Sequence, residues 1–201
     1  MTKLVTPDGE SRCGWAGAAP EFLSYHDTEW GFPVADDIQL FEKLCLESFQ
    51  SGLSWRTILA KREHFRRAFA GFDFRIVAEF AGAEVERLLN DSGIVRHRGK
   101  IEAAINNAHR AIELLEEGRT LAAYFWSFEP VADELAAAPA VSISQAAKVL
   151  SKDLKMRGWR FVGPTTALAF MQAAGLVNDH ATDCVIRPLV NARRFGFTPP
   201  G

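Results

Sequence analysis

Apolar residues recur at intervals of three and four positions along most of the 201-residue chain. This spacing places them on one face of a helix, whereas the alternating Val, Ile and Thr runs typical of a sheet are nearly absent. The clearest case is the segment from about Arg98 to Glu117, in which the apolar side chains share one face and Gly118 follows. The pattern predicts an all-α fold and no sheet.

Residues that can accept hydrogen bonds from free backbone amides mark where several helices are expected to begin. These candidate N-caps are Asp36 or Asp37, Ser54, Asp73 and Ser144. Two further helices are expected over about 83–90 and 164–174. The Ala/Pro-rich stretch Glu134–Ala140 is expected to be a loop between two groups of helices.

Length and composition favour one domain, expected over residues 12–190, with a disordered lead-in over 1–11 and a C-terminal tail over 191–201. Hydrophobic residues make up 48% of the chain, which is enough for a sizeable core. No stretch approaches the roughly 18 apolar residues of a membrane span, and the first residues do not resemble a signal peptide. Three cysteines give an odd number, so we expect reduced thiols and a cytoplasmic protein rather than a disulfide framework.

Two pairs of metal-binding residue types lie near opposite ends of the chain. Cys13 and His26 are near the start, and His180 and Cys184 form a His-x-x-x-Cys arrangement near the end. On a helix, positions i and i+4 lie about 6 Å apart on one face, so two such pairs could surround one tetrahedral zinc ion. The alternative is that these are unrelated core cysteines and hydrogen-bonded histidines. Cys45, on an apolar helix face, is expected to belong to the core.

A glycine-flanked segment, Gly158–Thr166, lies between two expected helices of a region spanning about 144–174. In a helix–hairpin–helix, such glycines let backbone amides point outward at a phosphate. A plain αα-hairpin is the alternative. A second basic turn, Gly93–Lys100, could also contact phosphate, and a solvated helix start is the alternative. The run Lys61–Arg67 is expected to be an exposed helix face, with the side chain of Phe65 pointing inward.

Eight short segments occur in the order typical of one family. They are Arg12–Trp15, Tyr25–Gly31, Leu40–Glu47, Gly52–Trp55, Gly93–Lys100, Phe125–Phe128, Phe161–Gly163 and Phe170–His180. Together they cover roughly residues 12 to 185 and resemble the bacterial DNA-3-methyladenine glycosylase I family, a branch of the helix–hairpin–helix glycosylases. The resemblance implies base excision repair: release of 3-methyladenine from alkylated double-stranded DNA by a monofunctional enzyme. It also implies a monomer with no obligatory protein partner.

The resemblance assigns roles to individual residues. It implies one structural zinc ion per chain, and the family's ligands fall on Cys13, His26, His180 and Cys184. The pocket carboxylate, which is the expected catalytic group, falls on Glu47; spacing alone would make this residue a solvent-facing helix carboxylate. The base-pocket aromatic residues are Tyr25, Trp55, Trp15 and Trp30. The expected DNA-backbone contacts are Arg160, Phe161, Val162, Gly163 and Thr165.

Two residues differ from those of relatives, and one absence limits the chemistry. Phe22 stands where some members carry a tyrosine, which removes a hydroxyl from the pocket mouth. Asn178 stands where many relatives in the wider superfamily carry an aspartate, and no lysine lies between Trp159 and Gly163 to form a Schiff base. We therefore expect an enzyme that excises already destabilised bases without lyase activity. A zinc hydrolase and a non-catalytic damage-binding module are the competing hypotheses.

Overall fold

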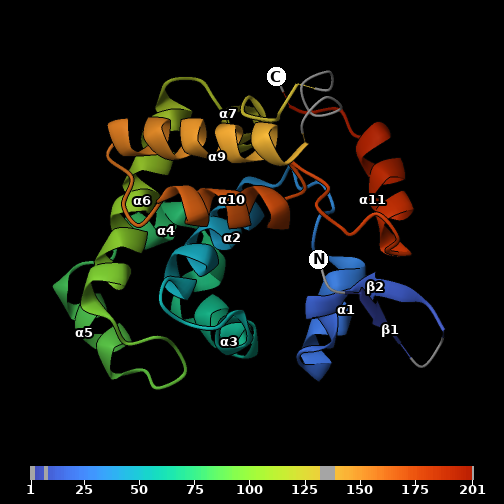
Figure 1. The fold of residues 1–201 in the computed structure, drawn as a ribbon. Helices are drawn as coiled ribbons and strands as arrows, with labels where there is room; N and C mark the ends of the chain where they lie inside the picture. The colour runs from blue at the N-terminus through green and yellow to red at the C-terminus, as the bar shows by residue number, and fades with distance from the viewer. Residues whose placement is uncertain (1–2, 7–8, 132–138, 201) are drawn as a thin grey trace.

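The computed structural model describes residues 3–6, 9–131 and 139–200, which form a mostly helical chain (Figure 1). The long elements are α2 (Asp37–Gln50), α3 (Trp55–Ala68), α6 (Arg98–Glu116), α9 (Pro139–Met156), α10 (Pro164–Ala173) and α11 (Ile186–Phe195). The shorter elements are β1 (Lys3–Val5), β2 (Ser11–Cys13), η1 (Gly14–Gly17), α1 (Pro20–Thr28), η2 (Ala70–Phe72), α4 (Phe74–Ala78), α5 (Gly82–Asn90) and α7 (Leu121–Trp126).

Helix starts follow the sequence prediction at three of the expected caps. The side chains of Asp36, Ser54 and Asp73 accept hydrogen bonds from backbone amides at the start of α2, α3 and α4. Ser144 was expected to begin a helix, but α9 already begins at Pro139, so Ser144 lies inside it. Most of the loop expected over 134–140 lies outside the described residues.

The expectation of no sheet was wrong. β1 and β2 pair antiparallel, with Lys3 opposite Cys13 and Val5 opposite Ser11. Part of the segment expected to be a disordered lead-in therefore forms a strand, and the hairpin ends at Cys13. A three-residue strand is too short for an alternating pattern to distinguish it from a loop, so the sequence carries no signal for it.

The core is built around α2. Its buried apolar side chains point to all sides of the helix, which is the pattern of a helix enclosed by others. Helices α3, α6, α7 and α10 pack against it. Because α2 is enclosed in this way, any polar side chain on it is either paired or faces a cavity.

The N-terminal elements and the last helix, α11, lie on the same side of the molecule (Figure 1). Strands β1 and β2 and helix α1 lie there together with α11, and the amide of Val185 donates to the carbonyl of Ser11 at 2.8 Å. Helix α11 continues to Phe195, past the boundary expected at residue 190. Among the described residues, no helix is long and apolar enough to cross a membrane.

Candidate active site and metal centre

Four buried side chains from the two chain ends meet at one point. Nε2 of His26 lies 3.2 Å from Nδ1 of His180, and Sγ of Cys184 lies 3.6 Å from each of these nitrogens. Sγ of Cys13 lies 3.7 Å from Nδ1 of His180. All four ligand atoms lie within 4.8 Å of one another, so these side chains could hold a metal ion. We call these four residues the metal group.

The donor atoms and their spacing fit zinc. A tetrahedral zinc ion with Zn–N near 2.0 Å and Zn–S near 2.3 Å needs ligand atoms roughly 3.3–3.8 Å apart. The second nitrogen of each histidine has an acceptor: Nδ1 of His26 lies 2.7 Å from a carboxylate oxygen of Asp27, and Nε2 of His180 lies 3.0 Å from the carbonyl of Trp30. Such outer contacts fix the tautomer of a histidine that binds metal.

The prediction that His180 and Cys184 lie on a helix was wrong. His180 and Cys184 were placed on a helix so that their i, i+4 spacing would bring them together. The structure has them in a turn before α11, in which the amide of Cys184 donates to the carbonyl of Ala181 at 3.0 Å. The turn achieves what the helix was expected to achieve, because it also folds the chain back within four residues.

A cavity of about 350 Å³ lies next to the metal group. Its lining contains every residue predicted for the base pocket, namely Trp15, Tyr25, Trp30, Glu47 and Trp55. Phe22, Gln50, Ala169 and Gln172 complete the lining. We call this space the aromatic cavity. Its walls come from η1, α1, α2, α3 and α10.

Glu47 is the acidic group of the aromatic cavity. It is 6% exposed, and among the described residues no donor is hydrogen-bonded to its carboxylate. Burial raises the pKa of this carboxyl to about 8, while the charge of Lys43 opposes the rise. The indole nitrogen of Trp55 is also buried without a hydrogen-bond partner. A buried carboxylate without a donor is costly unless a ligand supplies one, so this arrangement is that of a binding site.

The metal group supports one wall of the aromatic cavity. The ring of Trp15 packs edge-on against His26 at 5.2 Å between centroids, and Trp30 packs against His180 at 4.6 Å. Trp15 and Trp30 also contact each other at 5.1 Å. The positions of both tryptophans therefore depend on the two histidines.

The segment between α9 and α10 forms a turn that is held from three sides. Asn107 of α6 accepts from the amide of Arg160 at 2.8 Å and donates to its carbonyl at 3.0 Å. Ser48, next to Glu47 on α2, donates to the carbonyl of Phe161 at 3.1 Å. Ser151 donates to the carbonyl of Val162 at 2.7 Å.

The residues predicted to contact DNA in this turn differ in accessibility. Arg160, Phe161 and Thr165 are exposed, and Gly163 is partly exposed. Val162 is 1% exposed and its side chain lies in the core, so it can offer DNA only its backbone. Phe161 has a φ of 55°, a conformation that turns the chain sharply and leaves its side chain on the surface. Helix α10 then begins with Pro164 and no side-chain cap.

Comparison with known proteins shows what the chain is related to. The model of the family described as methyladenine glycosylase matches residues 15–187. The chain belongs to the methyladenine glycosylase family. It is 45% identical over 181 residues to DNA-3-methyladenine glycosylase 1 of Escherichia coli (strain K12), covering 88% of this chain and 97% of that protein. It is 42% identical over 178 residues to the DNA-3-methyladenine glycosylase of Haemophilus influenzae, covering 87% and 96%.

Solved structures of family members have the same fold. A crystal structure of a 3-methyladenine DNA glycosylase I matches with a TM-score of 0.78 and 43% identity, covering 87% of this chain and 98% of that one. The Staphylococcus aureus enzyme, whose structure is described as the basis of 3-methyladenine recognition, matches with a TM-score of 0.76 and 33% identity, covering 88% and 96%. Methyladenine glycosylases are hydrolases of N-glycosyl bonds, and this chain is such an enzyme.

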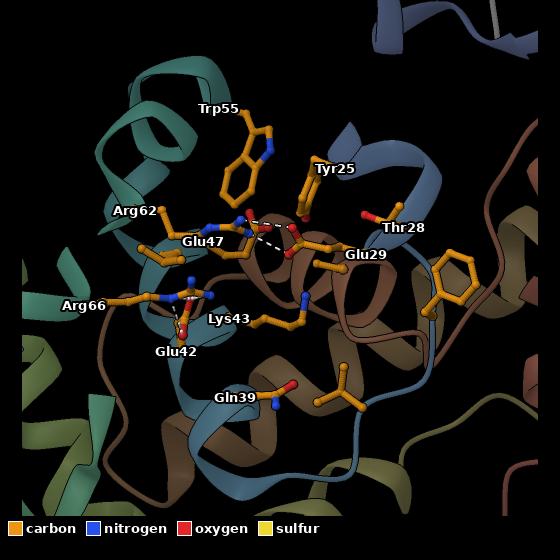
Figure 2. A pocket seen from close by; sticks show the side chains of 14 residues that line it. Tyr25, Thr28, Glu29, Gln39, Glu42, Lys43, Glu47, Trp55, Arg62 and Arg66 are labelled. Carbon is orange, nitrogen blue, oxygen red and sulfur yellow. Dashed lines mark hydrogen bonds and ion pairs between the residues drawn. The ribbon is translucent and has the colours of Figure 1, made fainter. Parts of the chain in front are cut away.

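This methyladenine glycosylase also has a second cavity, of about 330 Å³, that shares Tyr25, Glu47 and Trp55 with the first (Figure 2). We call it the charged cavity, because its remaining lining is mainly polar. It consists of Thr28, Glu29, Phe32, Val34, Gln39, Glu42, Lys43, Leu46, Arg62, Arg66 and Ala173.

Two ion pairs bridge the charged cavity (Figure 2). Arg62 donates two hydrogen bonds to Glu29, at 2.6 and 2.9 Å, and Arg66 donates from Nε to Glu42 at 2.9 Å. The prediction that Lys61–Arg67 forms an exposed helix face is wrong for Arg62, whose side chain is 19% exposed and turns inward to Glu29. The side chain of Arg66 is 38% exposed and pairs with the buried Glu42. Although burial opposes it, the hydrogen bonds and charge of Arg62 lower the pKa of Glu29.

The charged cavity of this methyladenine glycosylase was not among the predicted features, although the sequence carries a signal for it. Gln39, Lys43 and Glu47 follow one another at intervals of four along α2, a helix whose other residues are mostly apolar. A polar stripe at that spacing on an enclosed helix indicates that one face borders a cavity. Gln50 and Gln172, which line the aromatic cavity, had no such signal.

Proposed function

We propose that this enzyme releases 3-methyladenine from alkylated double-stranded DNA by hydrolysing its N-glycosidic bond. The observation that carries the proposal is the buried Glu47 carboxylate, which no described residue hydrogen-bonds, in the aromatic cavity with Tyr25 and Trp55. Relatives named DNA-3-methyladenine glycosylase and a family structure in complex with 3-methyladenine support this substrate.

The aromatic cavity suits a cationic base that has left the duplex. A base must be rotated out of the stack before an enzyme can enclose it. 3-Methyladenine in DNA carries positive charge on its ring, and aromatic faces attract cations by about 1 kcal/mol or more when water is excluded. The Glu47 carboxylate can accept from the exocyclic amine and attract the ring charge, whereas neutral adenine lacks the second interaction.

The same charge makes the base a good leaving group, so the protein needs little general-acid help. Asn178, at the position where many relatives in the wider superfamily carry an aspartate, donates to the carbonyl of Arg187 at 3.0 Å and to Oδ1 of Asn191 at 2.7 Å. It therefore acts as a structural amide that ties the turn of the metal group to α11. The described residues that line the aromatic cavity include no lysine whose amine could attack the sugar. These features support hydrolysis without lyase activity.

We propose that Cys13, His26, His180 and Cys184 hold one structural zinc ion. Four protein ligands in a buried group leave no position for a water nucleophile, so the ion would supply fold stability and no chemistry. A zinc hydrolase would need an open position next to a substrate cavity.

A pH dependence follows from Glu47. Because burial raises its pKa to about 8, the carboxyl is largely protonated below that pH and charged above it. Since the charged form attracts the cationic base, kcat/KM for 3-methyladenine release should rise as pH increases through about 8 and then level off. Single-turnover excision between about pH 6 and 9.5 measures this. A profile with no rise near 8, or the same rise in Glu47→Gln, contradicts the assignment.

We further propose that α9, the turn and α10 form a helix–hairpin–helix that binds the DNA backbone. The uncapped start of α10 presents free amides, and Arg160 adds a cation beside them. Arg160→Ala should weaken binding to duplexes of any sequence about equally. It should also reduce the slope of log K against log salt concentration by roughly one. Arg75→Ala, an exposed arginine on α4, is the matched control. An unchanged salt slope would remove Arg160 from the interface.

The proposed function is tested by incubating the enzyme with methylated duplex DNA and identifying the released bases by chromatography. The expected product is 3-methyladenine, with little 7-methylguanine and with the DNA strand uncut at the abasic site until alkali is added. Strand cleavage by the enzyme itself would show lyase activity. Tight binding to the methylated DNA without release of any base would favour the damage-binding module.

A further inference from the structure

Lys43 is the unmatched cation of the charged cavity. Arg62 and Arg66 are each hydrogen-bonded to a carboxylate of their own, Glu29 and Glu42. By contrast, among the described residues no carboxylate oxygen lies within 4.0 Å of the Lys43 amine. Once the two arginine pairs are set aside, Lys43 and Glu47 are the remaining opposite charges of this cavity.

The geometry places Lys43 in one cavity with Glu47. The two residues are four positions apart on α2, so they lie on one face of the helix. Both line the charged cavity, and Figure 2 shows the Lys43 amine turned toward the side on which Glu29 and Glu47 lie. Only Glu47 of the two also lines the aromatic cavity. Lys43 therefore shares the charged cavity with Glu47 and does not line the proposed base site.

We propose that Lys43 is a positioning residue that favours the charged form of the Glu47 carboxylate from the cavity that the base does not enter. The inference rests on the proposed function, because it assigns the charge state of the group that would bind the cationic base. It gives the charged cavity a role in selecting the substrate.

The charges around Glu47 support this role. Burial raises the pKa of Glu47 to about 8, and Lys43 is the cation whose charge lowers it. Burial also lowers the pKa of Lys43, but the charges of Glu29 and Glu42 oppose that effect and favour the ammonium form. The titratable and charged groups on this side are Tyr25 and Glu29 from the α1 end, Glu42 and Lys43 from α2, and Arg62 and Arg66 from α3. Helix α10 contributes Ala173 here, which is uncharged.

The position of Lys43 in the charged cavity matters for selectivity. A cation in the aromatic cavity would repel the cationic base directly. Lys43 lines the same cavity as the carboxylate but not the cavity proposed for the base, and Coulomb energy falls with distance. The lysine therefore stabilises the charged Glu47 carboxylate more than it repels the cationic base. Its removal should move the pH at which the site becomes active and leave the activity at high pH equal or higher.

The direct test is a titration of Glu47 in the free enzyme. Carbon-13 carboxyl signals of labelled glutamate are followed with pH, and the Glu47 signal is assigned by its absence in Glu47→Gln. In Lys43→Met the midpoint should move upward by about one pH unit, and in Lys43→Arg by a few tenths at most. Lys43→Gln serves as a second neutral variant if Lys43→Met does not fold. An unchanged midpoint in the neutral variant overturns the proposal without bearing on the proposed function.

Excision kinetics give the second readout. At pH 7, Lys43→Met should release 3-methyladenine about tenfold more slowly than the unmodified enzyme, and the difference should vanish above about pH 9.5. In a Glu47→Gln background the same substitution should have no effect on the pH profile. A pH-independent loss would mean that Lys43 only supports the fold, and an inactive unmodified enzyme would instead contradict the proposed function.

Discussion

Glu47→Gln should lower the rate of 3-methyladenine release by roughly 100-fold or more while leaving the fold intact. A 100-fold loss corresponds to about 2.7 kcal/mol, which is within the range for removing a charge-assisted hydrogen bond from a buried site. The amide keeps the shape of the side chain, which is 6% exposed, and removes only its negative charge. Single-turnover excision on methylated DNA and circular dichroism measure the two halves of this prediction.

The same variant should be more stable than the unmodified enzyme at alkaline pH. Glu47 has a folded-state pKa of about 8, whereas an unfolded glutamate titrates near 4.3. Its contribution to stability is therefore fully present below about pH 4.3 and is lost as pH rises through about 8. Glu47→Gln does not titrate, so its advantage should grow over that window and reach roughly 1–3 kcal/mol above pH 8.

The matched control is Glu102→Gln, which removes an exposed carboxylate on α6 near Arg98. It should change neither excision nor the pH dependence of stability by a measurable amount. Glu47 is excluded from the site if Glu47→Gln excises at the rate of the unmodified enzyme. A fall in stability at pH 9 would instead mean that the carboxylate has a partner in the folded protein.

Loss of one of the four proposed zinc ligands should unfold the enzyme. Cys184→Ala removes one of the four ligand atoms of the buried group, through which the proposed zinc ion would join the N-terminal segment to the turn before α11. Structural zinc sites contribute about 10 kcal/mol or more of binding free energy, which is comparable to the whole stability of a domain. We expect less than one zinc ion per chain, a large fall in Tm and loss of the near-ultraviolet signal of Trp15 and Trp30.

Cys45→Ala is the control for this experiment, because Cys45 is also a buried thiol. It lies on α2 at 1% exposure and outside the metal group. Its removal should cost about 1 kcal/mol and leave the zinc content at one per chain. Chelation that removes zinc and abolishes excision without any change in Tm or circular dichroism would favour the zinc hydrolase over a structural ion.

Local rules predicted the helices well and the short elements poorly. Asp36, Ser54 and Asp73 cap helices as expected, because an N-cap depends on residues within one turn. The pairing of β1 with β2 was not predictable, since three-residue strands carry no periodic signal. Ser144 was misplaced because the apolar pattern that follows it does not exclude an earlier start at Pro139.

For the site, too, residues in recognisable motifs were predicted, and features that depend on contacts between distant helices were not. Family motifs placed Tyr25, Glu47 and Trp55 correctly in one cavity, which spacing alone could not do because they lie on three different helices. The charged cavity was missed because a run of basic residues on α3 has the pattern of a solvated face. Arg62 turns inward, and Arg66 pairs with Glu42, only because α1 and α2 present carboxylates to them.

Comparison of the unmodified enzyme with Glu47→Gln on the same methylated duplex DNA tests the central claim most directly. The free bases are separated by chromatography at pH 8 and followed over time. We predict that the unmodified enzyme releases 3-methyladenine with little 7-methylguanine, and that Glu47→Gln, folded and loaded with zinc, releases roughly 100-fold less per unit time. Equal release by the two proteins, or no 3-methyladenine from the unmodified enzyme at micromolar concentration, would contradict the account.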